Sequence, residues 1–156
     1  MVEVIIVILI VMILSAVAIT RWNYDSVKRV SAARKVAGDI RYAQKLAVTT
    51  QSRSGIGFNA NGYTVYRDAA ALTIAQSPGD ICSTNPAGQF VVDFTAQRCS
   101  DFSGVVIAPP AGVIAFNSMG TPVDTAGNPL AAQNITLTIG GNSVLTIEAG
   151  TGRVSY

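Results

Sequence analysis

Cys82 and Cys99 carry the most distinctive side-chain chemistry in this sequence. The chain has no histidine, so it lacks Ser-His and Cys-His nucleophiles as well as the commonest metal ligand. Two cysteines in a stretch rich in turn residues favour a disulfide and an oxidising compartment, with a pair of free thiols as the alternative. Such a bridge would stabilise its domain by about 3 kcal/mol in the chain-entropy picture.

The acidic residues of the second half of the chain suggest turns rather than a metal site. Asp124 with Asn128, or Asp80 with Asp93, could be placed around calcium, but neither pair fits a regular calcium-loop pattern. Asp and Asn more often close turns with their own backbone. The sequence also shows no phosphate-binding glycine loop and no carboxylate pair at catalytic spacing. We therefore expect no enzyme activity, no cofactor and no metal.

Glu3 is the one carboxylate in an unusual place, because it opens the apolar stretch "MVEVIIVILIVMILSAVAIT". It could simply lie at a headgroup boundary, where a helix N-terminus favours a negative charge by about 0.3–1 kcal/mol. Alternatively, it could neutralise a positive charge on another copy of the chain. A lone ionised group within hydrocarbon costs a few kcal/mol, so such pairing would be strongly favoured.

The segment from Val4 to Ile19 is apolar apart from Ser15, and with its flanks it is long enough to cross a bilayer as a helix of about 20 residues. A cationic and aromatic cluster of the kind found at headgroup level follows it at Arg21, Trp22 and Tyr24. No basic stretch precedes the apolar run, which argues against a cleaved signal peptide. We predict that residues 1–20 form the membrane or filament-core half of a helix, with core positions Val4, Ile5, Ile8, Leu9, Val11, Met12, Leu14 and Val17.

The helical period continues beyond this run, and we predict an amphipathic half over residues 21–53. Apolar residues at steps of three and four form a narrow stripe of Val27, Val30, Ala33, Ala37, Ile40, Ala43 and Ala47. The opposing positions are basic: Lys28, Arg29, Arg34, Lys35, Arg41 and Lys45. The two halves together predict one helix of about 75 Å, ending near Gln51.

The pattern changes to alternation after Gly55, and we predict a β-rich head over residues 54–156. "IGFNANGYTVYRD" reads as a hairpin turning at Asn61-Gly62, and "ITLTIGGNSVLTIEA" as one turning at Gly140, Gly141 and Asn142. Further strands are expected in "QFVVDFTA", "GVVIA", "GVIAF" and "GRVSY". The predicted class is α+β, a long helix packed on a small antiparallel sheet. The predicted core is Ile56, Phe58, Val65, Val91, Phe94, Val106, Ile114, Phe116, Ile135, Leu137, Ile139, Leu145 and Ile147.

Charge is divided between the two parts of the chain. Up to Arg53 there are eight basic and three acidic residues, a net of +5, whereas from Ser54 there are three basic and six acidic residues, a net of −3. Acidic heads could therefore face the basic helices of neighbouring copies, although a solvated basic face is the commoner arrangement. If the charges do meet, assembly should weaken as salt rises toward about 1 M.

A membrane-length helix that continues into a basic amphipathic helix and a small β-head resembles a type IV pilin or a type II secretion pseudopilin. In that family, mature chains begin like Phe-Thr-Leu-Ile-Glu before a long apolar run, so Glu3 would occupy the acidic position if Phe-Thr preceded Met1. The stretch "FNSMGTPVD…ITLTIGGNSVLTIEAGTGRVSY" is similar to the ending of the H-type minor pseudopilins and related minor pilins. The resemblance is carried by these two stretches and does not extend to the region around Cys82 and Cys99.

The resemblance implies a structural subunit of a homo-oligomeric or mixed filament, with Glu3 setting the register of the incoming helix. It also implies a leader cut by a prepilin peptidase, N-terminal methylation, an assembly platform, and a single-pass stage in a bacterial inner membrane before a periplasmic or extracellular filament. The basic residues that follow the apolar run would by themselves place the head in the cytoplasm. A basic leader and the expected disulfide instead favour a periplasmic head.

Two other functions remain open from the sequence. A minor pilin could bind DNA through a basic C-terminus, but here "TGRVSY" offers only Arg153 on an acidic head, a weak phosphate contact. Nucleic acid is therefore an improbable partner, and Arg153 remains a candidate partner contact. A bitopic membrane anchor that never assembles is the other alternative. The sequence does not distinguish a secretion pseudopilus from a surface pilus, or a major from a minor subunit.

Overall fold

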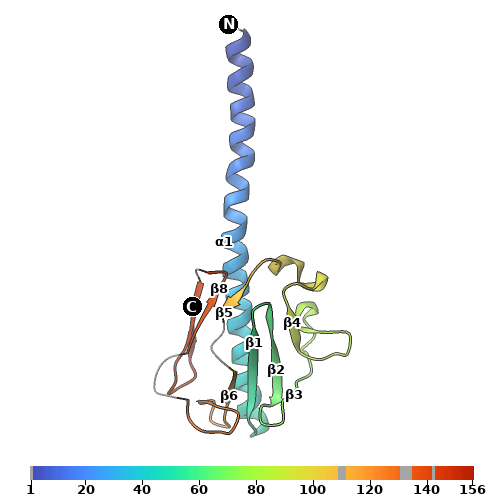
Figure 1. Ribbon diagram of the computed structural model, residues 1–156, viewed down its shortest axis with the longest axis vertical. Helices are drawn as coiled ribbons and strands as arrows, with labels where there is room; N and C mark the ends of the chain where they lie inside the picture. The colour runs from blue at the N-terminus through green and yellow to red at the C-terminus, as the bar shows by residue number, and fades with distance from the viewer. Residues whose placement is uncertain (1, 109–111, 131–134, 142) are drawn as a thin grey trace.

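The computed structural model describes residues 2–108, 112–130, 135–141 and 143–156, without the side chains of residues 16–24, 135 and 143. One long helix, α1 (Val2–Thr50), carries a β-rich head on its second half, while its first half projects away from the head (Figure 1). The predicted α+β class is confirmed. At 1.5 Å per residue, the 49 residues of α1 extend for about 74 Å.

The end of α1 is set by Gln51, which adopts a left-handed backbone conformation with φ of 52°. A residue of this kind commonly terminates a helix. The last turn leaves carbonyls without helical partners, and nearby side chains satisfy some of them. The Gln51 Nε2 donates to the Val48 carbonyl at 2.8 Å, and the Thr50 hydroxyl donates to the Leu46 carbonyl at 2.7 Å. The chain then turns directly into the first strand.

The larger sheet contains the first predicted hairpin. Its strands run antiparallel in the order β3-β2-β1-β6-β7, and β4 also pairs with β2. Their bounds are β1 (Ser54–Asn59), β2 (Gly62–Asp68), β3 (Thr73–Ile74), β4 (Val91–Asp93), β6 (Val113–Phe116) and β7 (Pro122–Val123). The predicted turn is wrong by one residue, because Asn59 pairs with Gly62 and leaves Ala60 and Asn61 as the loop. Gly62 belongs to the strand, where a Cβ would collide with the Val92 carbonyl of β4.

The smaller sheet holds the second hairpin, with strands in the order β10-β9-β8-β5. Their bounds are β5 (Ile107–Ala108), β8 (Ile135–Ile139), β9 (Ser143–Ile147) and β10 (Val154–Ser155). The hairpin prediction is confirmed, since Leu137 pairs with Leu145 and Ile139 with Ser143 around Gly140 and Gly141. Asn142, the third predicted turn residue, lies outside the described residues. Two short 3₁₀ helices, η1 (Ile81–Ser83) and η2 (Gln97–Phe102), flank the segment that contains β4.

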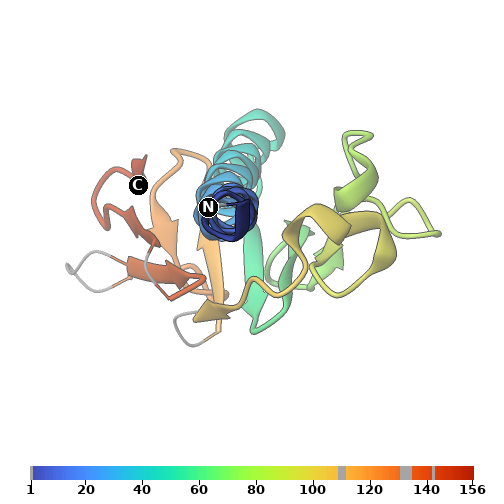
Figure 2. The same cartoon turned by 90° about the horizontal axis from the view of Figure 1, so that it is seen from above.

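Both sheets pack on the second half of α1, and their strands spread below the helix when the molecule is viewed along it (Figure 2). Five positions of the predicted stripe, from Ala33 to Ala47, are fully buried or nearly so, and Ala32 and Val36 are buried as well. Mostly alanine, this face lets the sheets approach closely. Val27 and Val30 were also predicted for the stripe, but they are exposed, because at this level of α1 the head contacts the helix through Lys28 and Arg29 instead.

The predicted core is largely confirmed, with one clear error. Val106 is 52% exposed, whereas Val105 and Ile107 on either side of it are buried. Side chains of a strand alternate between the two faces, but these three consecutive residues are all aliphatic. The sequence therefore could not show which of them face inward. Phe58 and Val91 are only half-buried, and the side chain of Ile135 lies outside the description. Tyr63, Phe90 and Val92 belong to the core and were missed.

Candidate assembly interface and its support

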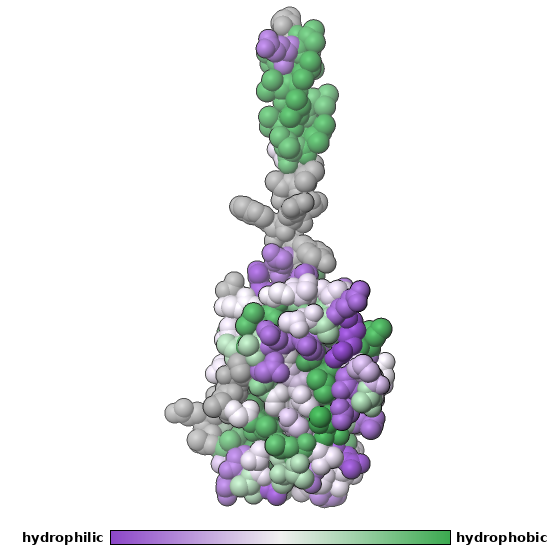
Figure 3. All heavy atoms as spheres, turned by 45° about the vertical axis from the view of Figure 1, so that its right-hand side comes forward, coloured by the Kyte–Doolittle hydropathy of each residue, from purple (hydrophilic) through white to green (hydrophobic). Residues whose placement is uncertain are grey.

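The first part of α1 exposes a continuous aliphatic surface, which we call the apolar arm (Val2–Ser15). Its predicted core residues with described side chains are all 50–68% exposed: Val4, Ile5, Ile8, Leu9, Val11, Met12 and Leu14. Figure 3 shows the arm as predominantly hydrophobic, projecting beyond a head of mixed polarity. Soluble monomers rarely leave so large a contiguous apolar surface in water, so the arm marks an interaction surface.

Glu3 lies in the first turn of α1 and is the only acidic residue in the arm. Its side chain is exposed at the end of the molecule farthest from the head. A carboxylate at this position complements the positive end of the helix dipole. Its exposure leaves it accessible to a charge on another molecule.

The predicted boundary cluster of Arg21, Trp22 and Tyr24, together with Val17, lies outside the described side chains. Where side chains are described, no helix of the structure is long and apolar enough to cross a membrane.

A charged network joins α1 to the loop that carries the cysteines. The Lys35 ammonium lies 2.6 Å from the Asp80 carboxylate and 3.4 Å from that of Asp39, and it donates to the Ser83 hydroxyl at 3.1 Å. The Tyr63 hydroxyl donates to Asp39 at 2.6 Å. Lys35 was predicted to belong to an outward basic face, but here it is half-buried and holds its own head in place.

Burial shapes the ionisation of this network. Desolvation raises the pKa of Asp39, despite the opposing hydrogen bond from Tyr63 and the charge of Lys35. Desolvation and the nearby Asp39 charge raise the pKa of Tyr63 well above its ordinary value. Desolvation also acts to raise the pKa of Asp80, but the hydrogen bonds from Lys35, Cys82 and Ser83 together with the Lys35 charge outweigh it and lower this pKa. Lys35 therefore lies beside two different carboxylates: the ionised form of Asp80 is stabilised, whereas that of Asp39 is disfavoured by burial.

Further along α1, two side chains tie the helix to backbone carbonyls of the head. Arg41 donates from Nη2 to the Val154 carbonyl at 2.9 Å, and the Gln44 amide donates to the Gly120 carbonyl at 2.8 Å. Arg41 was also predicted to belong to the outward basic face, and it is exposed although it makes this hydrogen bond. These contacts depend on carbonyls that are distant in sequence, and so no local pattern could have revealed them.

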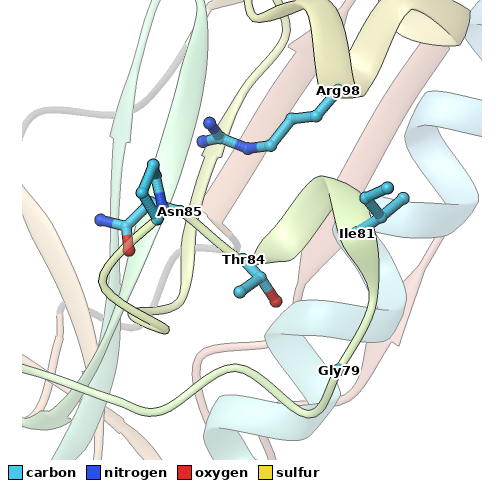
Figure 4. Close-up of a pocket in the computed structure, with 6 residues that line it drawn as sticks. Gly79, Ile81, Thr84, Asn85 and Arg98 are labelled. Atoms are coloured by element: carbon cyan, nitrogen blue, oxygen red, sulfur yellow. The ribbon is translucent and has the colours of Figure 1, made fainter.

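The predicted disulfide between Cys82 and Cys99 is present, and it links η1 to η2. Beside it lies an open pocket of about 590 Å³ that Gly79, Ile81, Thr84, Asn85, Pro86 and Arg98 line. Arg98 extends from η2 toward Asn85, as Figure 4 shows. Its Nη2 donates to the Val91 carbonyl at 3.2 Å, while the Thr84 and Asn85 side chains bond within their own loop. The polar groups of the pocket therefore mainly hold the loop in shape.

The acidic residues considered for calcium close turns. Asp124 accepts hydrogen bonds from the backbone and side-chain amides of Asn128, both at 2.9 Å, and Asp93 accepts from the backbone of Thr95 at 2.8 Å. Asp80 accepts from the backbone amide of Cys82 at the start of η1. Within the described residues, no group of three or more potential metal ligands comes together.

Arg153, the candidate partner contact, is engaged within the head. Its Nη2 lies 2.6 Å from the Glu148 carboxylate, and its Nε donates to the same oxygen at 3.1 Å. This neighbouring acid reduces the positive potential that a nucleic-acid phosphate would meet.

A long helix with an exposed apolar arm and a second half docked on antiparallel sheets defines a pilin-like protein. The family model for the type II transport protein GspH matches residues 32–152, which comprise the docked part of α1 and nearly the whole head. The chain belongs to this family of pilin-like pseudopilins and minor pilins.

A comparison with solved structures finds the type IV minor pilin FimU of Pseudomonas aeruginosa strain PAO1. The match has 19% identity and a TM-score of 0.48, and it covers 80% of this chain and 89% of the FimU chain. A comparison with curated proteins finds no match.

Proposed function

We propose that the chain is a structural subunit of a pilus-like filament, in a type II secretion or type IV pilus system. The apolar arm would first lie in a bacterial inner membrane with the head in the periplasm, and would then pack against the arms of other subunits. The observation that carries this proposal is the exposure of the arm in a chain of the GspH family. An isolated aliphatic helix of this kind needs either lipid or protein around it.

The structure supports different roles for the two halves of α1, with one half holding the head and the other available for assembly. The docked half is fixed to the head by the buried alanine face and by Lys35, Arg41 and Gln44. The described side chains of the arm, in contrast, are exposed, and no hydrogen bond or ion pair joins them to the head. An arm that is not needed for folding the head is available to other subunits. Bilayer burial would then be exchanged for burial between helices, with little change in apolar exposure.

Glu3 would set the register of this packing. Its carboxylate would neutralise a positive charge near the N-terminus of a neighbouring arm, where the apolar surroundings make an unpaired charge costly. An incoming helix that is shifted along the filament axis would leave both charges unpaired. The charge pair would therefore determine the axial position of the incoming subunit more than the strength with which it binds.

The test is filament formation in cells whose secretion or pilus apparatus is active. We expect Glu3→Gln and Glu3→Ala to abolish or strongly reduce incorporation, and Glu3→Asp to retain part of it. Ile13→Val is the matched control, because it changes the arm without changing its charge. Normal incorporation of Glu3→Ala would exclude the register role, and membrane-dispersed monomers in the wild type would exclude the filament.

The structure does not favour the DNA-binding alternative, because Arg153 is paired with Glu148. A steep, salt-dependent shift of DNA mobility by the full chain would reopen it.

A further inference from the structure

A small polar pocket lies where α1 leaves the head toward the apolar arm. Its volume is about 300 Å³, at the lower end of the range for small-molecule sites. It lies between one turn of the helix and two loops of the head, and its lining residues are Asp25, Lys28, Arg29, Ser103, Gly104 and Gly140, with Val105 beside them. Neither the charged network around Lys35 nor the proposed role of Glu3 involves this pocket.

The head holds both cations of the pocket in defined positions. Lys28 donates from Nζ to the Ser103 carbonyl and to the Ser103 hydroxyl, each at 3.3 Å. The aliphatic stem of Arg29 lies against Gly140, where a Cβ would collide with the Arg29 Cγ and Cδ. Gly140 has φ of 61°, so this turn position suits glycine on both grounds. Both Lys28 and Arg29 are half-buried.

The third charge of the pocket is negative. Asp25 lies three and four positions before Lys28 and Arg29, so all three side chains lie on neighbouring parts of one helix face. The pocket therefore combines two cations with one carboxylate. At its edge, Val106 is 52% exposed, and its carbonyl accepts the Gly140 amide at 2.8 Å. An apolar residue thus borders the charged site on the head.

We propose that this pocket binds the phosphoethanolamine headgroup of a membrane phospholipid. Lys28 and Arg29 would take the phosphate, since charge-assisted bonds from these side chains to phosphate are strong. Asp25 would accept hydrogen bonds from the primary ammonium. A choline headgroup cannot donate such bonds, and a glycerol headgroup offers Asp25 no positive charge.

The position of the pocket fits a lipid at the bilayer surface, and to this extent the inference rests on the proposed function. Lys28 and Arg29 lie about 14 Å along the helix beyond Ile19, the end of the apolar run. Side chains on a helix tilt toward its N-terminus, so both cations lean toward the membrane in which the arm would lie. A bound headgroup would fix the depth of the head before the subunit is extracted into the filament.

The test uses the full chain in nanodiscs with equal amounts of phosphatidylethanolamine, phosphatidylglycerol and phosphatidylcholine, followed by mass spectrometry of the lipids it retains. We expect enrichment of phosphatidylethanolamine over both others, falling by about fivefold for each of Lys28→Gln and Arg29→Gln. Asp25→Asn should remove the preference for ethanolamine while phosphate-containing lipids are still retained. Because Asp25 is exposed, this variant keeps the test decisive if a cation variant unfolds.

Arg34→Gln with Lys45→Gln is the matched control, because it removes two exposed cations of α1 that do not line the pocket. We expect this variant to retain lipids like the wild type. Equal retention of the three lipids, a preference for phosphatidylglycerol, or no effect of Lys28→Gln and Arg29→Gln would overturn the proposal. Carbonate extraction of membranes distinguishes the failure of this proposal from the failure of the proposed function. If the chain resists extraction but shows no lipid preference, only the headgroup proposal is overturned. If the chain is extracted, both the headgroup proposal and the membrane stage of the proposed function are overturned.

Discussion

The two halves of α1 have opposite relations to the rest of the molecule. In the apolar arm, large aliphatic side chains such as Ile8 and Leu14 are exposed over half or more of their surface. In the docked half, Val36 and Ile40 are completely buried among alanines that face both sheets. The head of this chain therefore buries the apolar residues of the docked half, whereas the arm needs another molecule to cover its apolar surface.

This difference teaches that hydrophobicity alone does not show which residues stabilise the fold. The apolar arm contributes little to packing within the subunit, because its described side chains are exposed and do not pack on the head. The less apolar half holds the head through small side chains and a few specific polar contacts. Substitutions in the two halves should therefore separate folding from assembly.

The largest expected difference is between truncations in the two halves. Ile40→Ala should lower the free energy of unfolding of the head by about 2–5 kcal/mol, because it leaves a cavity in the core. Ile8→Ala should change this free energy by no more than about 0.5 kcal/mol. Denaturation of the full chain in mild detergent, followed by near-ultraviolet circular dichroism, measures both. Equal losses in the two variants would contradict the division.

The disulfide should support the head alone. Replacing both Cys82 and Cys99 by serine opens a loop with a sequence separation of 17, at an expected cost of about 3 kcal/mol in the chain-entropy picture. The same denaturation experiment gives the change in stability, and far-ultraviolet circular dichroism reports the helix. If the variant is as stable as the wild type, the loop is held by other contacts, such as Lys35 with Asp80.

Gly38 offers a smaller effect with the opposite sign. It is exposed in the docked half of α1, and a Cβ added there meets nothing within 4 Å. Gly38→Ala should therefore stabilise the subunit by about 0.5–1 kcal/mol. Gly140→Ala is the contrasting variant, since its Cβ would collide with Arg29, and it should destabilise the head. A destabilised Gly38→Ala would indicate that this helix face is covered.

The smallest expected effect is the pH dependence that Asp39 introduces. Its pKa is raised in the folded state by desolvation, so the folded protein binds this proton more tightly than the unfolded chain does. As pH falls from neutral through the raised pKa toward the ordinary value of 3.8, Asp39 should add stability. Asp39→Asn should lack this contribution. The measurement is the free energy of unfolding of the wild type and of Asp39→Asn across this pH range. If the pKa of Asp39 is not raised, the two free energies will change in parallel with pH.

Local pattern was enough to predict the helix and both hairpins, because periodicity and turn residues act over short stretches. It failed at Val106, where a run of aliphatic residues carries no phase, and at Gly62, whose role depends on the β4 backbone. The basic face was predicted only in part, since Arg34, Arg41 and Lys45 are exposed, whereas Lys28, Arg29 and Lys35 are half-buried. Lys35 reaches Asp80 and Arg41 reaches the Val154 carbonyl, and such long-range partners cannot be read from one helix.

The candidate site divides in the same way. The composition of the arm was enough to select its residues and Glu3 as candidates for an assembly interface. The two cysteines of the chain were enough to suggest the disulfide. The pocket at Lys28 and Arg29 was not predicted, since it needs the loop at Ser103 and the turn at Gly140 to approach the helix. The sequence signal, a carboxylate one turn before two cations, is too common on helices to have indicated a site.

Photo-crosslinking from the arm tests the central claim most directly. A photoreactive amino acid in place of Ile10, in cells with an active secretion or pilus apparatus, should give a ladder of crosslinked subunits. The same group in place of Met119, which is 80% exposed on the head, reports contacts outside the arm. We predict that the Ile10 ladder depends on Glu3. Crosslinks from Ile10 to lipid alone, with no ladder of subunits, would contradict the account.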